Sequence, residues 1–208
     1  MKPNLTFTRI VVASALCACL SGCLFKPAAV TTRSFVLTAP ETETRAGAGN
    51  QVAIGLARVT LPDYLLRESM VVRKNDNEVE RLENALWAER LDHSFQRALA
   101  ANLSSQLGRG RIRVSSWQPR EVALVVRVNV GRLDLDAKGR GTLTARWQIE
   151  SADSGKVLKL GESSLNKSGA TPYSDPATIA ATLSDLTAQF SDVLVKALRE
   201  LEPTAATR

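Results

Sequence analysis

A hydrophobic N-terminal run that ends at a cysteine decides which part of this chain is able to fold into a domain. Lys2 and Arg9 precede an apolar stretch from Ile10 to Leu20, and Ser21-Gly22-Cys23 follows it. Charged, then apolar, then small residues is the order of a secretory signal peptide. The run is shorter than the roughly 20 apolar residues that a membrane-spanning helix needs. Residues 1–22 are therefore predicted to be a cleaved signal peptide, and the folded domain has to lie after them.

The tetrad Leu20-Ser21-Gly22-Cys23 resembles a bacterial lipobox. This resemblance implies that Cys23 becomes the first residue of the mature protein and carries a diacylglycerol thioether and an amino-terminal acyl chain such as palmitate. One acyl chain binds a membrane only marginally, whereas two or more give stable attachment. The alternatives are a plain signal peptide with an incidental cysteine, or a short buried helix.

The residue after Cys23 bears on which membrane holds the anchor. In enterobacterial lipoproteins an Asp at this position resembles a signal for retention in the inner membrane, and this chain has Leu24. We therefore expect a lipid-anchored protein of the outer membrane that faces the periplasm. Residues 23–32 have no strong hydrophobic period and are expected to form a lipidated N-terminus and tether.

Cysteines and charges exclude several kinds of site. Cys17 and Cys19 lie in the predicted signal peptide, so Cys23 alone would remain in the mature chain. That leaves no thiolate metal site and no intramolecular disulfide. The formal net charge is +6, but the basic residues are spread from Arg58 to Arg199. Nucleic-acid binders concentrate their charge on one face, so no nucleic-acid partner is expected.

The first half of the predicted domain begins with short strands and ends with a helix. Alternating apolar residues predict strands at 34–38 and 51–59, and a hairpin with strands at 70–73 and 78–82. Pro62 has no amide hydrogen to donate, so the chain must leave the sheet there. From Asn84 the period becomes helical, and Gly108 is a C-terminal stop signal. The polar side of this helix is expected to carry Glu89, Arg90, Asp92, His93, Gln96 and Arg97.

The second half reads as four strands and a final helix. The strands are predicted at 112–116, 122–135, 142–150 and 157–165, and turn residues at 136–139 and 153–156 indicate two successive antiparallel hairpins. Ser174 or Asp175 would cap the last helix, Pro176 suits its first turn, and Pro203 lies beyond its end. A coiled-coil seam is the alternative for this helix, but its apolar period lasts for too few heptads.

These elements predict an α/β fold in a single domain. Its mixed β-sheet with antiparallel hairpins would be covered by two long amphipathic helices. The predicted organisation is a signal peptide at 1–22, a lipidated N-terminus and tether at 23–32, the domain at 33–202 and a C-terminal tail at 203–208. Strand order does not follow from the pattern.

Residues with catalytic or metal-binding chemistry are sparse. His93 is the single histidine, no serine lies in a G-x-S-x-G motif, and the glycines lack phosphate-loop spacing. Asp134 and Asp136 lie where a strand runs into a hairpin, and we interpret them as turn-forming residues rather than metal ligands. A carboxylate enzyme would have to use Glu89 with Asp92, or Glu78 with Glu80. We predict no enzymatic activity, no cofactor and no metal.

Three motifs in the first half carry a family resemblance. They are Leu61-Pro62-Asp63-Tyr64-Leu65-Leu66-Arg67, then Val71-Val72-Arg73, then Leu86-Trp87-Ala88-Glu89-Arg90-Leu91. Their order and spacing resemble the PqiC (YmbA) group, the ABC-type transport auxiliary lipoproteins, as does Arg146-Trp147 in a later strand. The similarity extends over about residues 33 to 200. Leu66 stands where the family pattern has Asp, and Phe35 replaces a common Tyr.

The resemblance implies an outer-membrane lipoprotein that works with a periplasmic MCE-domain protein and an ABC transporter to move lipids between membranes. It further implies no ATP hydrolysis by this chain, and several copies in a ring at the tip of an MCE tube. Partner-contact candidates are Tyr64, Leu65, Arg67 and Trp87, because aromatic and arginine side chains dominate binding hot spots. The alternative for each is a role in the core or in loop structure.

Two other functions fit a small lipidated α/β protein. One is an assembly or plug lipoprotein for an outer-membrane β-barrel complex, and the other is a periplasmic hydrolase. A pull-down that recovers a barrel would favour the first. Turnover that depends on one carboxylate would favour the second.

Overall fold

The computed structural model describes residues 31–40, 53–118 and 120–201, and a compact unit begins at Thr32. The predicted signal peptide, Cys23 and the tail after 201 lie outside the described residues. None of the helices in the described ranges has the length and apolar character needed to cross a membrane.

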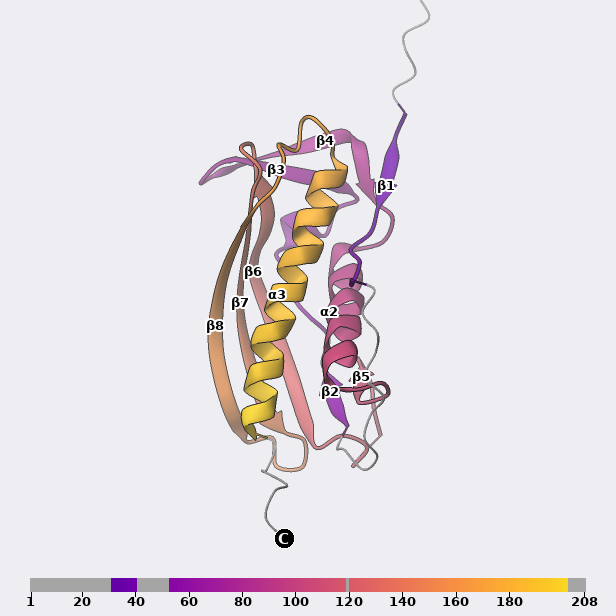
Figure 1. Cartoon of the computed structure of the whole chain (residues 1–208), viewed down its shortest axis with the longest axis vertical. Coiled ribbons are helices and arrows are strands. Elements are labelled where there is room, and N and C mark those ends of the chain that lie inside the picture. The colour runs from indigo at the N-terminus through magenta and orange to yellow at the C-terminus, as the bar shows by residue number, and fades with distance from the viewer. Residues whose placement is uncertain (1–30, 41–52, 119, 202–208) are drawn as a thin grey trace, which may run out of the picture. The chain divides into compact units, whose positions relative to one another are not determined.

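One mixed sheet contains all the strands that the structure describes (Figure 1). The strands are β1 (Arg33–Phe35), β2 (Ile54–Leu56), β3 (Ser69–Asn75), β4 (Glu78–Trp87), β5 (Ile112–Val114), β6 (Leu124–Asp136), β7 (Arg140–Ser151) and β8 (Val157–Ser168). The helices are a 3-10 turn η2 (Asp63–Leu65), α2 (Leu91–Leu107) and α3 (Ala177–Leu201). The predicted α/β class with two long helices is confirmed.

Strand β6 organises the sheet because it pairs with three other strands. Along one edge it runs antiparallel to β7, which in turn pairs with β8. Along the other edge, β2 pairs in parallel with the beginning of β6, and β3 pairs in parallel with its end at Leu135 and Asp136. Outside β2 lies β5, and outside β3 lie β4 and then β1. The two hairpins predicted in the second half of the domain, β6–β7 and β7–β8, are confirmed.

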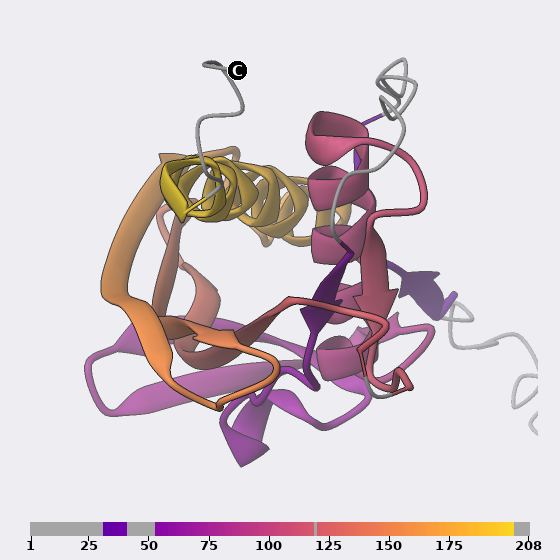
Figure 2. The ribbon, with the colours of Figure 1, turned by 90° about the horizontal axis from the view of Figure 1, so that it is seen from below.

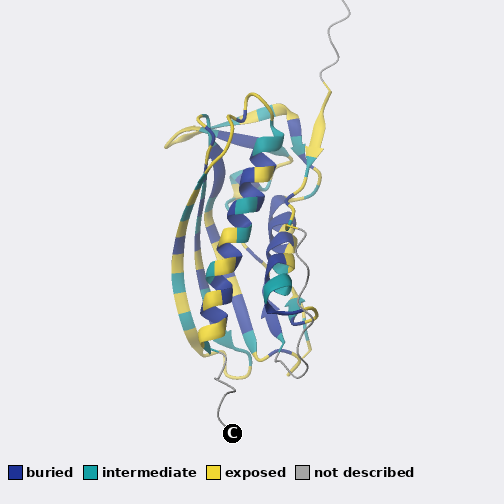
Figure 3. Ribbon diagram, in the orientation of Figure 1, coloured by how far each residue is buried: buried dark blue, intermediate teal, exposed yellow. Residues whose placement is uncertain are grey.

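Helices α2 and α3 pack side by side on one face of this curved sheet (Figures 1 and 2). The Phe95 and Phe190 rings meet between the two helices, with their centroids 6.4 Å apart. Buried residues follow one side of each helix and alternate along β6 and β7 (Figure 3). We call the face of β6, β7 and β8 that points away from α3 the outer face.

Strands β1 and β2 are shorter than the sequence pattern predicts, and residues 51–52 of the second predicted strand lie outside the described residues. At the end of β1, side-chain hydroxyls replace the hydrogen bonds of the strand. After β1, the Leu37 amide donates to Ser94 Oγ at 2.9 Å, and the Thr38 amide donates to Ser184 Oγ at 3.0 Å. These hydroxyls belong to α2 and α3. After β2 the chain continues irregularly beside β6, with Thr60 bridged to Asn129.

The start of the first long helix was predicted too early. Residues from Asn84 to Trp87 belong to β4, where Ala85 and Trp87 are buried and pair with β1. The helix begins at Leu91 and ends at Leu107, and Gly108 follows it as the predicted C-terminal stop. Trp87 would be buried whether it lay in the predicted helix or in β4, so the spacing of apolar residues alone could not distinguish the helix from the strand.

The predicted polar side of α2 is partly wrong. Asp92 and Gln96 are buried, whereas His93 and Arg97 are exposed. Gln96 Nε2 donates to the carbonyl of Ala57 at 3.0 Å, which ties the helix to the segment after β2. A buried amide with a backbone partner avoids the cost of an unpaired polar group.

The N-terminus of α3 confirms one of the two predicted caps. The Asp175 carboxylate accepts a hydrogen bond from the Ala177 amide at 3.0 Å. This bond and the Arg33 guanidinium lower the pKa of Asp175, in that order of importance. Arg33 Nη1 lies 2.8 Å from the same carboxylate, so β1 is fixed to the start of α3.

Candidate functional site

A buried carboxylate on β6 brings two of the sequence motifs together. Asp134 is 0% exposed, and its carboxylate receives a hydrogen bond from Tyr64 Oη at 3.1 Å. It also receives one from Arg73 Nε at 2.8 Å and one from Arg132 Nε at 2.8 Å. Tyr64 lies in η2, which begins directly after Pro62, and Arg73 lies in β3. We call Tyr64, Arg73, Arg132 and Asp134 the Asp134 cluster.

The electrostatics of this cluster follow from burial and mutual contact. Burial raises the pKa of Tyr64, and the Asp134 carboxylate raises it further, while Arg73 opposes both. The hydrogen bond to Asp134 raises the pKa of Arg73. Arg73 also donates to Tyr64 Oη at 3.2 Å, so the three side chains close a ring of contacts. A buried carboxylate is stable only when it is paired and hydrogen-bonded in this way.

The interpretation of Asp134 as a turn residue was wrong. Only Asp136 acts in the turn, because its carboxylate accepts hydrogen bonds from the amides of Lys138 and Arg140. Asp134 instead joins the segment after β2, strand β3 and strand β6. A charged residue two positions before a turn gives no sequence signal that it is buried.

The four predicted partner-contact residues occupy different environments. Leu65 is 3% exposed and Trp87 is 6% exposed, and both belong to the hydrophobic core. Tyr64 is half-buried, with its hydroxyl committed to the Asp134 cluster. Arg67 is the one of the four that is exposed.

A second group of charges fixes the loop between β8 and α3 to the β3–β4 hairpin. Tyr173 Oη donates to Glu80 Oε2 at 2.7 Å, and Lys74 Nζ lies 2.8 Å from the same oxygen. The Lys74 ammonium also lies 5.3 Å from the centroid of the Tyr173 ring. The hydrogen bonds from Lys74 and Tyr173 lower the pKa of Glu80. Glu80 is therefore committed to a structural contact.

The remaining catalytic candidates are also engaged in local contacts. Arg97 pairs with Glu89, and Arg90 pairs with Asp92. Glu78 accepts a hydrogen bond from the Asn75 amide group. Within the ranges that the structure describes, no three His, Cys, Asp or Glu side chains gather as metal ligands.

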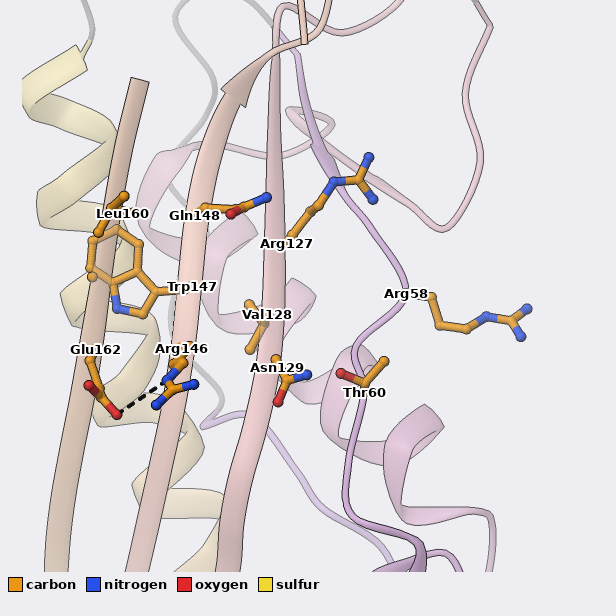
Figure 4. A pocket seen from close by; sticks show the side chains of 11 residues that line it. Arg58, Thr60, Arg127, Val128, Asn129, Arg146, Trp147, Gln148, Leu160 and Glu162 are labelled. Atoms are coloured by element: carbon orange, nitrogen blue, oxygen red, sulfur yellow. Dashed lines mark ion pairs between the residues drawn. The ribbon is translucent and has the colours of Figure 1, made fainter. Parts of the chain in front are cut away.

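An open groove of about 610 Å³ lies on the outer face, near the start of β6 (Figure 4). The strand register arranges its side chains in two rows. One row runs from Leu160 through Gln148 to Arg127, and the other runs from Glu162 through Arg146 to Asn129. Thr60 continues the second row, and Arg58 lies at the margin of the groove.

The arginines of this groove use few of their hydrogen-bond donors. Arg127 Nε lies 3.0 Å and 3.1 Å from the two oxygens of Glu150, and no described residue accepts from its terminal nitrogens. Arg146 Nε lies 3.6 Å from Glu162, which is too long for a hydrogen bond, and the side chains are 82% and 69% exposed. Arg58 makes no ion pair with any described residue. The groove therefore presents guanidinium N–H groups to solvent.

Sequence reasoning missed this groove because its parts are far apart in the chain. Single arginines at alternate positions of separate strands look like solvated surface residues. Only the pairing of β6 with β7 and β8 places them in adjacent rows. In the sequence, the Arg146-Trp147 pair indicates the family resemblance but does not predict a binding site.

The class of protein follows from a match to a family model. The model of the ABC-type transport auxiliary lipoprotein component matches residues 35–195, and the chain belongs to this family. Tyr64 and Arg73 of the family-like motifs meet at Asp134, which gives the motif spacing a structural reason.

Individual relatives are similar over smaller or more divergent regions. The intermembrane transport lipoprotein PqiC of Escherichia coli is 38% identical over 66 residues, or 32% of this chain and 35% of PqiC. The match thus spans about a third of that relative. The crystal structure of Xanthomonas campestris protein XCC0632 has a TM-score of 0.65 at 14% identity, covering 79% of this chain and 93% of that one. An uncharacterised protein of known structure has a TM-score of 0.59 at 22% identity, covering 75% of this chain and 99% of that one.

Proposed function

We propose that this chain is a non-enzymatic outer-membrane lipoprotein that serves as the auxiliary component of an MCE/ABC-type intermembrane lipid transport system. Family membership over residues 35–195 is the observation that carries this proposal. The named relative PqiC is an intermembrane transport lipoprotein, which supports the same role. Of the four carboxylates weighed as catalytic, Glu80, Asp92 and Glu89 form ion pairs and the fourth accepts a hydrogen bond from Asn75, which supports a binding role.

Cys23 is the proposed point of attachment. It lies outside the described residues, and the proposal rests on the lipobox-like tetrad. Acyl chains on Cys23 would hold the domain at the periplasmic face of the outer membrane on a tether of residues 24–32. Such a tether spans at most about 30 Å, since an extended chain covers about 3.3–3.6 Å per residue.

The anchor is tested by labelling cells with radioactive palmitate and separating inner and outer membranes on a density gradient. The wild-type chain is expected to take up label and to sediment with the outer membrane. Cys23→Ala is expected to lose both the label and the membrane association. Label retained by Cys23→Ala, or wild-type protein in the inner membrane, would overturn this part of the proposal.

The proposed partner is the periplasmic MCE-domain protein, contacted by several copies of this chain. Arg67 is the contact candidate that the fold leaves exposed, two residues after the turn η2. Tyr64 and Leu65 would support this surface from below, and Trp87 would support it through the core.

Affinity purification of the lipidated protein from its native envelope tests the partner. Gentle detergent extraction, mass spectrometry and sizing are expected to recover an MCE-domain protein in an assembly with several copies of this chain. Arg67→Glu is expected to reduce that recovery, whereas Arg113→Glu, on β5, serves as the matched charge reversal. Recovery of a β-barrel instead, or of the monomer alone, would contradict the proposal.

A further inference from the structure

We propose that the outer-face groove binds the phosphate of an anionic amphiphile, the chemistry of an acidic phospholipid headgroup. Arg127 and Arg146 would donate to the phosphate oxygens, and Leu160 would contact the apolar part of the ligand. This inference rests on the proposed role in lipid transport, and it adds a ligand site on this chain itself.

The donors are available because no described residue uses them. Among the described residues, Arg127 donates only from its Nε, to Glu150, so both terminal nitrogens remain for a ligand. Within the same ranges, the contact of Arg146 is a long, exposed one to Glu162. Planar guanidinium groups bind phosphate oxygens through two parallel hydrogen bonds. A phosphate therefore competes for Arg146 against one solvated carboxylate and gains contacts that Glu162 does not make.

The strand register places the two arginines close enough to share one ligand. Arg127 pairs with Gln148, and Arg146 pairs with Asn129, so the arginines are diagonal neighbours on adjacent strands. Diagonal positions in an antiparallel pair lie roughly 7–8 Å apart, which long side chains bridge. Figure 4 shows the Arg146 guanidinium beside Glu162, whereas the Arg127 guanidinium points away from it toward the segment that carries Arg58, so Arg127 would turn toward Arg146 when both bind one ligand.

An apolar side chain on β8 completes the amphiphilic character of the groove. Leu160 is 74% exposed and lies in the same row as Arg127. This exposed leucine beside the guanidinium groups matches a ligand that has a charged head and an apolar body. The groove volume of about 610 Å³ suits the headgroup and glycerol, so the acyl chains would extend beyond it.

The groove lies far from the point where the anchored N-terminus enters the domain. Arg33 of β1 pairs with Asp175 at the start of α3, whereas Lys159, next to Leu160, pairs with Glu200 near the end of α3. A helix of 25 residues is about 37 Å long. The groove and Arg33 therefore lie toward opposite ends of α3.

Native mass spectrometry of the full-length lipoprotein in a neutral maltoside detergent tests this site. Dioleoyl phosphatidylglycerol, dioleoyl phosphatidylcholine and inorganic phosphate are titrated separately, and the bound fraction is measured. Phosphatidylglycerol is expected to bind roughly tenfold more tightly than phosphatidylcholine, because both carry a phosphodiester but the choline ammonium places a like charge beside the guanidinium groups. Inorganic phosphate is expected to compete with phosphatidylglycerol, but only weakly, because it lacks the apolar body.

The variants separate the groove from general basicity. Arg127→Gln/Arg146→Gln is expected to weaken phosphatidylglycerol binding at least tenfold. Glu162→Gln is expected to strengthen it, because a competing carboxylate is removed. Arg113→Gln, the matched control on β5, is expected to leave binding unchanged. Leu160→Ser should weaken binding of the lipid but not of inorganic phosphate.

Equal phosphatidylglycerol binding by the wild type and Arg127→Gln/Arg146→Gln would overturn the proposal, as would equal binding of the two lipids. Inorganic phosphate that binds as tightly as the lipid would limit the site to a free anion and would also overturn it. A glutamate-rich peptide that binds through Arg127 where phosphatidylglycerol does not bind would assign the groove to a protein partner instead. All these measurements omit the MCE protein, so their failure leaves the proposed partner untouched.

Discussion

Asp134→Asn tests whether the Asp134 cluster holds the fold together. Asp134 is 0% exposed, and the side chains of Arg73 and Arg132 are 14% and 33% exposed. Removing one partner of a buried ion pair typically costs about 3–5 kcal/mol, because a charge is left uncompensated. Here water reaches both arginines in part, so the expected loss is at the lower end, about 3 kcal/mol. For a domain of this size that corresponds to a decrease in Tm of about 6–12 °C.

Urea denaturation and thermal unfolding of the wild type and the variant measure this loss. The midpoint should fall while the slope of the free energy against urea stays constant. Asp185→Asn is the matched control, because it breaks an exposed pair with Lys167 and should cost less than about 1 kcal/mol. Arg73→Gln combined with Asp134→Asn should cost less than the sum of the single changes, because the stranded charge is removed. An Asp134→Asn protein as stable as Asp185→Asn would show that the Asp134 cluster does not stabilise the fold.

Three further changes probe the core and the charged surface. Phe190→Ala removes a fully buried ring between the two helices and should lower the free energy of unfolding by about 3–5 kcal/mol, measured in urea. Gly161→Ala would place Cβ against Trp147 Cζ2, so it should cost about 1–3 kcal/mol and shift the fluorescence of Trp147. Unchanged emission would contradict this contact. The hydrogen bond from Arg90 lowers the pKa of Asp92 in the folded protein. The Arg90–Asp92 pair therefore stabilises the fold at pH values above the unfolded pKa of about 3.9, and this stabilisation is lost as the pH falls through the lower folded pKa. Asp92→Asn should therefore show a shallower loss of stability on acidification, and an unchanged acid limb would exclude this role.

Periodic patterns predicted the second half of the fold well because its elements are long. Strands β6, β7 and β8 and helix α3 each repeat their apolar positions many times, and the turns between them carry glycine and aspartate. The short strands β1 and β2 end where hydroxyls on the helices and an irregular segment replace the ladder. Such tertiary hydrogen bonds leave no periodic signal in the sequence.

The boundary between β4 and α2 shows a different limit. Trp87 and Leu91 are four residues apart, as on one face of a helix, but they lie in a strand and in the following helix. Both are buried in the same core, so hydrophobicity alone assigns them to one element. The pairing of Phe35 with Trp87 decides the matter, and it is a long-range contact.

The motifs identified the family before the structure gave them a physical role. Tyr64 and Arg73 are nine residues apart, and Asp134 is far along the chain, so their meeting depends on the parallel pairing of β3 with β6. Two of the four contact candidates, Leu65 and Trp87, lie in the core. A motif that supports the fold and a motif that touches a partner have the same appearance in one sequence.

A reciprocal pull-down tests whether this chain is the auxiliary component of an MCE/ABC-type transport system. An affinity tag on the MCE-domain protein of the same cell is used to purify it from the detergent-solubilised envelope, and this chain is quantified in the eluate and in the extract. Wild-type protein is expected to be retained in several copies per complex, and Cys23→Ala is expected to be depleted from the envelope fraction. Intact wild-type protein that remains in the extract and is absent from the eluate would contradict its assignment as the auxiliary component of that transport system.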